Sequence, residues 1–136
     1  MTRRHFLSAT AAAPALLQSQ SPNDVIRVGM IGVGNRGASL LKQVLKAPNV
    51  KVVAICDIDP DALKRAGQAA AAHSPDLLTD YRKLLDRKDI DAVLIATPVD
   101  LHREMTMGAL EVGKNIYCEK PMARTAEECR RVVDTA

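Results

Sequence analysis

Short apolar runs rich in β-branched residues alternate with segments of helical periodicity from Val25 onward. The predicted strands are Ile26–Ile31, Val50–Cys56, Leu77–Thr79, Ala92–Ala96 and Asn115–Cys118. The predicted helices are Gly37–Lys46, one that starts at Asp59-Pro60 and runs through Ala62–Ala72, a brief one through Leu84 and Leu85, His102–Val112, and one opening at Thr125. Strands joined by helices in strict alternation form a parallel sheet with right-handed crossovers. The sequence therefore predicts a doubly wound α/β domain.

Local capping signals support several of these helices. Asp59 is an N-cap acid followed by Pro60 at the first helical position. Asp80 occupies the N-cap position of the brief helix, and Thr125 opens a capping box. Gly113 has the place of a C′ glycine after the fourth helix.

Composition narrows the class of protein. The 136 residues have room for one domain, and an aromatic content of 2% requires an aliphatic core, which suits buried parallel strands. The net charge is +3, but without Arg3 and Arg4 it is +1, so no basic face remains to bind nucleic acid. Cys56, Cys118 and Cys129 fit neither a zinc spacing nor a disulfide framework, and we interpret them as buried apolar residues.

Residues 1–20 differ from the rest of the chain and are predicted to be a targeting segment. Arg3 and Arg4 precede a short, alanine-rich apolar run, which is too short to span a bilayer. The order of these features is similar to a twin-arginine (Tat) export signal and predicts the Tat machinery as a partner and a periplasmic or exported location. Cleavage at Ala13-Pro14-Ala15 or nearer Gln20 is compatible with the sequence. An untargeted tail or a weak helix is the alternative.

The string Gly32-Val33-Gly34-Asn35-Arg36-Gly37 is a G-x-G-x-x-G motif. It directly follows the first predicted strand and opens a helix, which is the context that a dinucleotide-binding fingerprint requires. In this interpretation Gly32 permits the tight turn, Gly34 lets a pyrophosphate approach the backbone, and Gly37 lets helix and strand pack closely. Free N–H groups at the helix N-terminus then face the phosphates.

Asp57 ends the second strand, about twenty residues past the motif, as the fingerprint expects. Its carboxylate can accept hydrogen bonds from both ribose hydroxyls of the adenosine and would repel a 2′-phosphate. The sequence therefore predicts NAD as the cofactor, with NADP less favoured. Arg36 complicates this preference, because a base beside the phosphate loop can tolerate a 2′-phosphate. The alternative for Asp57 is a solvated strand-end residue.

Two further segments end later strands and are predicted to lie at the same edge of the sheet. These are Thr97-Pro98 and Glu119-Lys120-Pro121, and ligands of such folds bind outside the carboxyl ends of the strands. The Lys120 ammonium can polarise a carbonyl or hydroxyl oxygen and stabilise negative charge that develops there. A surface lysine after a strand is the alternative.

Together these motifs resemble the N-terminal domain of the Gfo/Idh/MocA family. The resemblance covers Val25 to Ala136 and rests on the glycine motif, Ala96-Thr97-Pro98 with His102, Asp80–Leu85 and Glu119-Lys120-Pro121. It implies a Rossmann fold and hydride transfer between a nicotinamide and a hydroxyl-bearing carbon of a small, carbohydrate-like substrate, such as a sugar or cyclitol. It also implies a catalytic Lys120 beside the nicotinamide, and cofactor-cleft positions for Thr97, Pro98, His102 and Glu119. A half-exposed helix residue is the alternative for His102.

The family's second domain, which supplies the substrate pocket and usually a histidine acid/base, has no counterpart in this sequence. No histidine follows His102, although hydride transfer needs a proton donor or acceptor on the reacting oxygen. We expect a piece of a longer enzyme whose cut sheet leaves apolar surface exposed. A truncated product and a stand-alone nucleotide-binding module are alternatives, as is a methyltransferase-like site for S-adenosylmethionine. Whether the full-length form is a homo-oligomer stays open.

Overall fold

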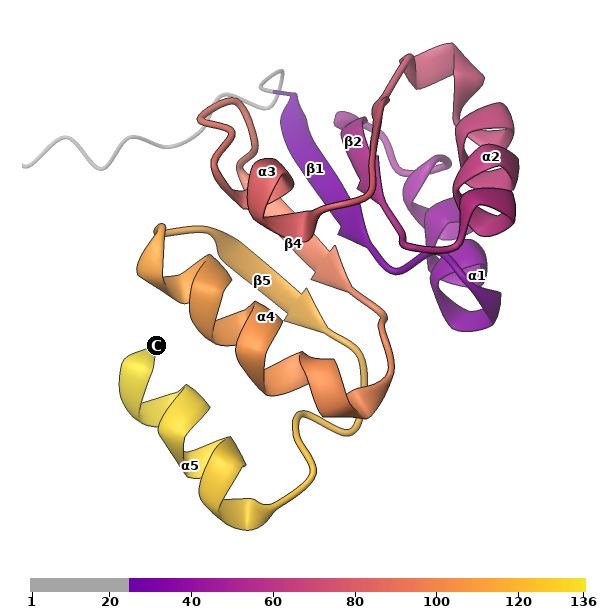
Figure 1. Cartoon of the computed structure of the whole chain (residues 1–136). Coiled ribbons are helices and arrows are strands. Elements are labelled where there is room, and N and C mark those ends of the chain that lie inside the picture. Colours follow the sequence, from indigo (N-terminus) through magenta and orange to yellow (C-terminus); the bar gives the residue numbers. More distant parts are fainter. Residues whose placement is uncertain (1–24) are drawn as a thin grey trace, which may run out of the picture.

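A computed structural model describes residues 25–136, so the predicted export signal and the linker after it lie outside the described residues. The described chain forms a parallel sheet of five strands in the order β3-β2-β1-β4-β5 (Figure 1). The strands are β1 Ile26–Ile31, β2 Val50–Cys56, β3 Asp76–Leu78, β4 Ala92–Ile95 and β5 Asn115–Cys118. The helices are α1 Asn35–Val44, α2 Pro60–Ala69, α3 Tyr81–Leu85, α4 Val99–Glu111 and α5 Ala126–Thr135.

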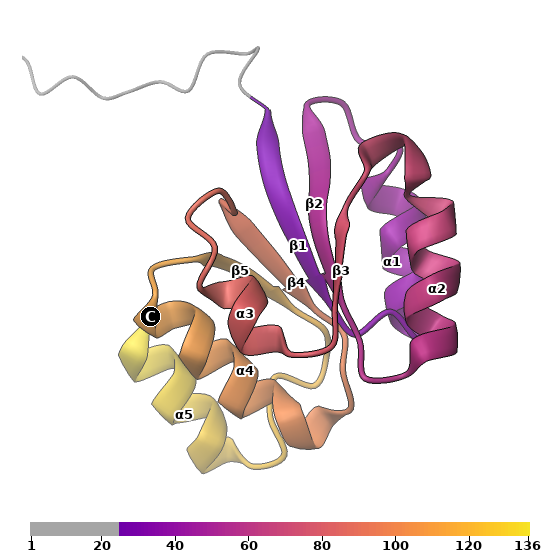
Figure 2. The same cartoon turned by 45° about the horizontal axis from the view of Figure 1, so that its top comes forward.

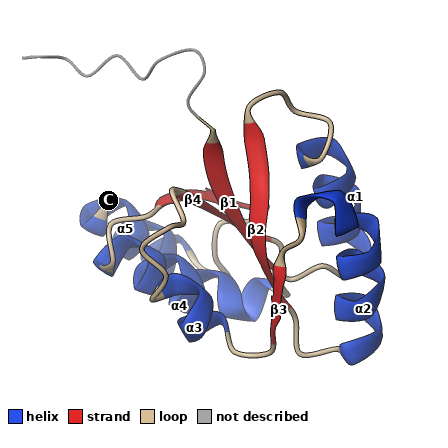
Figure 3. Ribbon diagram, turned by 90° about the horizontal axis from the view of Figure 1, so that it is seen from above, coloured by secondary structure: helices blue, strands red, loops and turns tan. Residues whose placement is uncertain are grey.

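Helices cover both faces of the sheet, which confirms the predicted doubly wound fold. Figures 2 and 3 show α1 and α2 on one side, and α3, α4 and α5 on the other. Successive side chains of β1 point to opposite faces of the sheet. Met30 belongs to the core under α1 and α2, and Ile31 belongs to the core under α3 and α4. The chain leaves β3 at one edge and re-enters beside β1 as β4, so the strand order reverses between β1 and β4.

The predicted N-cap residues are confirmed. The Asp59 carboxylate accepts a hydrogen bond from Asp61 N–H at 2.9 Å, and the Asp80 carboxylate accepts one from Arg82 N–H at 3.0 Å. Thr125 forms the predicted capping box with Glu128.

Several predicted boundaries are wrong, including those of three helices. Helix α1 starts at Asn35 rather than Gly37, and α4 starts at Val99 rather than His102. Helix α2 ends at Ala69 and is followed by a short 3₁₀ turn, η1 (Ala71–His73), instead of continuing through Ala72. The alanines favour helix, but no residue there specifies where the helix stops.

A bulge interrupts the pairing of β1 with β2. Val28 pairs with Val52 and Gly29 pairs with Ala54, so Val53 has no partner in the ladder. As a result, Val53 and Ala54 both contact the core under α3 and α4, whereas Ile55 returns to the opposite core.

Beyond the stretch where β2 pairs with β3, the η1 turn supplies a hydrogen bond to β2. Nδ1 of His73 accepts a hydrogen bond from the buried Val52 N–H at 3.0 Å. His73 therefore replaces a missing strand neighbour.

Among the described residues no helix is long and apolar enough to cross a membrane.

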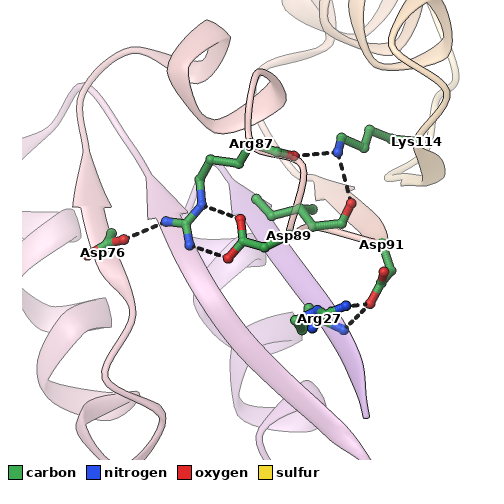
Figure 4. A network of polar contacts seen from close by, with 7 residues as sticks. Arg27, Asp76, Arg87, Asp89, Asp91 and Lys114 are labelled. Atoms are coloured by element: carbon green, nitrogen blue, oxygen red, sulfur yellow. Dashed lines mark hydrogen bonds and ion pairs between the residues drawn. The ribbon is translucent and has the colours of Figure 1, made fainter. Parts of the chain in front are cut away.

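A polar network joins the segments that enter the sheet, at the amino ends of the strands (Figure 4). Arg87, between α3 and β4, makes a bidentate contact with Asp89 at 2.7 and 2.9 Å and also pairs with Asp76 of β3. The Lys114 ammonium donates to the carbonyl oxygens of Arg87 and Ile90 just before β5. The network fixes the loop before β4 against both neighbouring segments.

Candidate functional site

The glycine loop joins β1 to α1, and two of its glycines are sterically required. Gly32 has a φ of 82°, and a Cβ there would lie 2.8 Å from backbone atoms of Ala96 and Thr97 at the end of β4. A Cβ at Gly37 would fall on the carbonyl oxygen of Gly32, whereas one at Gly34 would meet no described atom within 4 Å. The loop therefore lies tightly against β4 and leaves open space at Gly34.

The N-terminus of α1 is suited to an anion. Within the described part of the chain, no side chain caps it and its first turn holds no acidic residue. By contrast, Asp59, Asp80 and Thr125 cap α2, α3 and α5 with their own side chains. Uncapped helix N–H groups carry partial positive charge and seek an acceptor. Beside the open space at Gly34, these donors fit a phosphate group.

Asp57 links the end of β2 to the glycine loop. Its Oδ2 atom accepts a hydrogen bond from Val33 N–H at 2.7 Å, and its Oδ1 atom accepts one from Asp59 N–H at 2.9 Å. Each carboxylate oxygen keeps a second lone pair. The two backbone bonds thus orient the carboxylate and leave it able to accept from a ligand hydroxyl.

A cleft of about 410 Å³ opens at the carboxyl ends of β1, β2 and β4, where the strand order reverses. Six of the predicted site residues line it: Gly32, Gly34, Asn35, Asp57, Thr97 and Pro98. The other lining residues were not predicted as site residues; they are Ile31, Cys56, Ile58, Thr79, Tyr81, Ala96, Leu101 and Met105. The spacing of Leu101 and Met105 puts them on one face of α4, but the same spacing is typical of ordinary core residues.

Two lining side chains of the cleft are held in their neutral forms. Burial, with the neighbouring Asp57 carboxylate, raises the pKa of the Cys56 thiol to about 11. Burial also raises the pKa of Tyr81 to about 12, aided by the hydrogen bond that its hydroxyl donates to Glu104 at 2.6 Å. Neither group is suited to act as a nucleophile or base at neutral pH.

Arg36 and Glu119 do not line the cleft but pair with each other. The Arg36 guanidinium donates to the two carboxylate oxygens of Glu119 at 3.0 and 3.1 Å, which joins the first turn of α1 to the end of β5. These hydrogen bonds raise the pKa of Arg36 and lower the pKa of Glu119. The Arg36 side chain is 56% exposed and that of Glu119 is 9% exposed.

His102 is buried below the site, not half-exposed, with 2% of its surface accessible. Its Nε2 atom lies 2.7 Å from the carbonyl oxygen of Thr97, and its Nδ1 atom lies 2.7 Å from that of Pro121. Carbonyl oxygens only accept hydrogen bonds, so a neutral ring satisfies one contact and a doubly protonated ring satisfies both. One side chain thus connects the segments that follow β4 and β5.

Lys120 follows β5 at the same edge of the sheet and is exposed. It lines a separate hollow of about 570 Å³ between α4, β5 and α5, rather than the cleft beside the glycine loop. The peptide bond between Lys120 and Pro121 is cis. The catalytic role of Lys120 therefore stays a prediction.

Comparison with protein families matches residues 26–136 to the oxidoreductase family with an NAD-binding Rossmann fold, GFO_IDH_MocA. The chain belongs to the Gfo/Idh/MocA family of oxidoreductases. It is 39% identical to a glycosyl hydrolase family 109 protein of Shewanella pealeana, over 100% of this chain and 37% of the relative. It is also 35% identical to an α-N-acetylgalactosaminidase of Shewanella oneidensis, over 98% of this chain and 36% of the relative.

Solved structures of the family have the same fold. Myo-inositol dehydrogenase from Lactobacillus casei, in complex with NAD(H) and myo-inositol, matches with a TM-score of 0.77 and 33% identity, over 82% of this chain and 33% of that one. A 3-ketoreductase from Actinomadura kijaniata, in complex with NADP and TDP-benzene, matches with a TM-score of 0.74 and 31% identity, over 83% of this chain and 34% of that one. The chain spans about a third of the length of these proteins.

Proposed function

We propose that this chain is the cofactor-binding part of an oxidoreductase that transfers hydride between NAD and a hydroxyl-bearing carbon of a carbohydrate-like substrate. The observation that carries the proposal is the hydrogen bond from the glycine-loop residue Val33 to the Asp57 carboxylate, beside the uncapped N-terminus of α1. Bound NAD would accept or donate the hydride at its nicotinamide ring. The N–H groups of Gly34, Asn35 and Arg36 would hold the pyrophosphate, and Asp57 would bind the adenosine ribose.

Two features support NAD over NADP. The Asp57 carboxylate would repel a 2′-phosphate, and the charge of Arg36 is paired with Glu119. The solved structures include complexes with NAD(H) and with NADP, so the preference is part of the proposal.

The substrate class is supported by the relatives, whose names refer to inositol dehydrogenases, a 3-ketoreductase and glycosyl hydrolases. We expect Lys120 to polarise the reacting oxygen of the substrate, and a proton acceptor outside this chain to complete the site. A second candidate is that the whole protein cleaves glycosides. It is favoured by the identity to the glycosyl hydrolase relatives and is tested by release of nitrophenol from nitrophenyl α-N-acetylgalactosaminide.

The deciding experiment is calorimetric titration of NADH, NADPH and S-adenosylmethionine into the purified chain. We expect NADH to bind more tightly than NADPH and binding to be lost in Gly34→Val, because that side chain would fill the space proposed for the pyrophosphate. Gly108→Ala, a glycine substitution inside α4, is the control and should bind NADH normally. A folded wild-type chain that prefers S-adenosylmethionine, or binds none of the three, would contradict the proposal.

We also propose that residues 1–20 direct export through the Tat pathway, on the basis of Arg3, Arg4 and the apolar run after them. Sequencing the N-terminus of the protein isolated from its native host tests this. A mature protein that still begins at Met1 would exclude cleavage of such a signal.

A further inference from the structure

The residues on both sides of Lys120 are tied to other elements of the fold. Before it, the Glu119 N–H donates to the Ile95 carbonyl of β4 at 2.8 Å, and the Glu119 carboxylate is held by Arg36. After it, the Pro121 carbonyl lies 2.7 Å from the imidazole of His102. The lysine therefore sits on a short loop with fixed ends.

The two side chains reach the loop from opposite layers of the molecule. Arg36 belongs to α1 on one face of the sheet, and His102 belongs to α4 on the other (Figure 3). Arg36 holds the carboxylate through two bonds of a planar fork, which fixes direction as well as distance. His102 contacts the Thr97 carbonyl as well, so it also sets the loop relative to the end of β4.

Neither side chain lines the cleft. The cleft beside the glycine loop is lined by Gly34 and Asn35 but not by Arg36, and by Leu101 and Met105 but not by His102. Two of the three guanidinium nitrogens of Arg36 and both ring nitrogens of His102 lie within hydrogen-bond distance of other groups of the chain. Their geometry indicates support of the loop rather than recognition of a cofactor.

We propose that Arg36 and His102 are positioning residues for Lys120. They act through Glu119 and Pro121, and they fix the loop from which the Lys120 ammonium reaches the substrate. The inference rests on the proposed function, in which Lys120 polarises the reacting oxygen.

Local hydrogen exchange tests the proposal on the full chain without any cofactor. In Arg36→Met and in His102→Leu, we expect the amides of residues 119–124, apart from Pro121, to exchange roughly five- to tenfold faster than in the wild type, while those of β1 do not change. The rate at which the Lys120 amine is acetylated, measured by mass spectrometry, should differ from the wild-type rate by more than twofold in the same variants. Glu119→Gln should accelerate exchange as Arg36→Met does. Arg36→Lys, which keeps a positive charge, should accelerate it less than Arg36→Met.

Matched controls separate positioning from general destabilisation. Arg82→Met removes another exposed arginine that pairs with a glutamate, and His73→Leu removes another histidine that bonds the backbone. Both should leave exchange at residues 119–124 and acetylation of Lys120 unchanged. If His102→Leu fails to fold, His102→Met, which also lacks a hydrogen-bond donor, takes its place.

Exchange and acetylation within twofold of the wild type, in folded Arg36→Met and in a folded His102→Leu or His102→Met, would overturn the proposal. NADH titration of the wild type is a separate measurement. Absence of NADH binding would contradict the proposed function. Hydrogen exchange and acetylation in the variants would still show whether Arg36 and His102 position Lys120.

Discussion

Asp57 and Val33 join the second strand to the glycine loop through a 2.7 Å hydrogen bond from the Val33 N–H to the Asp57 carboxylate. The two residues lie 24 positions apart in the chain. The acid that is predicted to select the cofactor ribose therefore also shapes the loop that is predicted to hold the phosphates. Loss of the carboxylate would affect both ends of an adenosine diphosphate at once.

Asp57→Asn should weaken both folding and NADH binding. An amide accepts only through its oxygen, so one of the two N–H groups that Asp57 now satisfies would face an NH₂ group. We expect a loss of about 1 kcal/mol in unfolding free energy and a fall of about tenfold in NADH affinity. Urea denaturation and calorimetry measure these. Asp59→Asn is the matched control, because asparagine caps a helix as well as aspartate does. Equal NADH affinity in Asp57→Asn and Asp59→Asn would show that Asp57 does not contribute to NADH binding.

Gly37→Ala should destabilise the protein although alanine is the better helix former. Its Cβ would collide with the Gly32 carbonyl oxygen, and we expect a cost of about 1–3 kcal/mol in chemical denaturation. Gly108→Ala, whose Cβ would lie 3.4 Å from the flexible end of Leu85, should instead stabilise by up to about 1 kcal/mol. Effects of the same sign at both positions would contradict the steric account.

His73→Leu should lower the free energy of unfolding by about 1–3 kcal/mol, because it leaves the buried Val52 N–H without its acceptor. His73→Asn, whose side-chain oxygen can accept the same bond, should recover part of the loss. Urea denaturation of the three proteins checks this. Wild-type stability in His73→Leu would show that another group accepts the bond.

The pairing of Arg36 with Glu119 should make a pH-dependent contribution to stability. Because the Arg36 hydrogen bonds lower the pKa of Glu119 below its ordinary 4.5, the folded state favours the ionised carboxylate. The contribution is therefore complete above pH 4.5 and is lost as the pH falls through the lowered pKa. Carbon-detected NMR titration of Glu119 should give a midpoint below 4.5 that rises in Arg36→Met and stays in place in Arg82→Met.

Local sequence signals predicted most of the fold. The apolar runs of β1, β2 and β5 end at the predicted residues, because Gly32, Asp57 and Glu119 mark clear changes of pattern. Helices with a capping residue, such as Asp59 and Thr125, also start where expected.

Contacts between distant residues were not predictable in the same way. Arg36 and Glu119 are 83 positions apart, and each alone resembles an ordinary exposed charge. The bond from Val52 to His73 depends on how far β3 extends along β2, which no local pattern specifies. Leu101 and Met105 line the cleft, but in the sequence they are indistinguishable from core residues.

The ion-pair network around Arg87 has a practical consequence, because every member precedes a strand or occupies its first two residues (Figure 4). The cleft lies at the opposite, carboxyl ends of the strands. Engineering for heat resistance can therefore concentrate on one end of the sheet and leave the lining of the cleft at the other end untouched. Such a separation matters because stabilising substitutions often reduce activity where the active site needs flexibility.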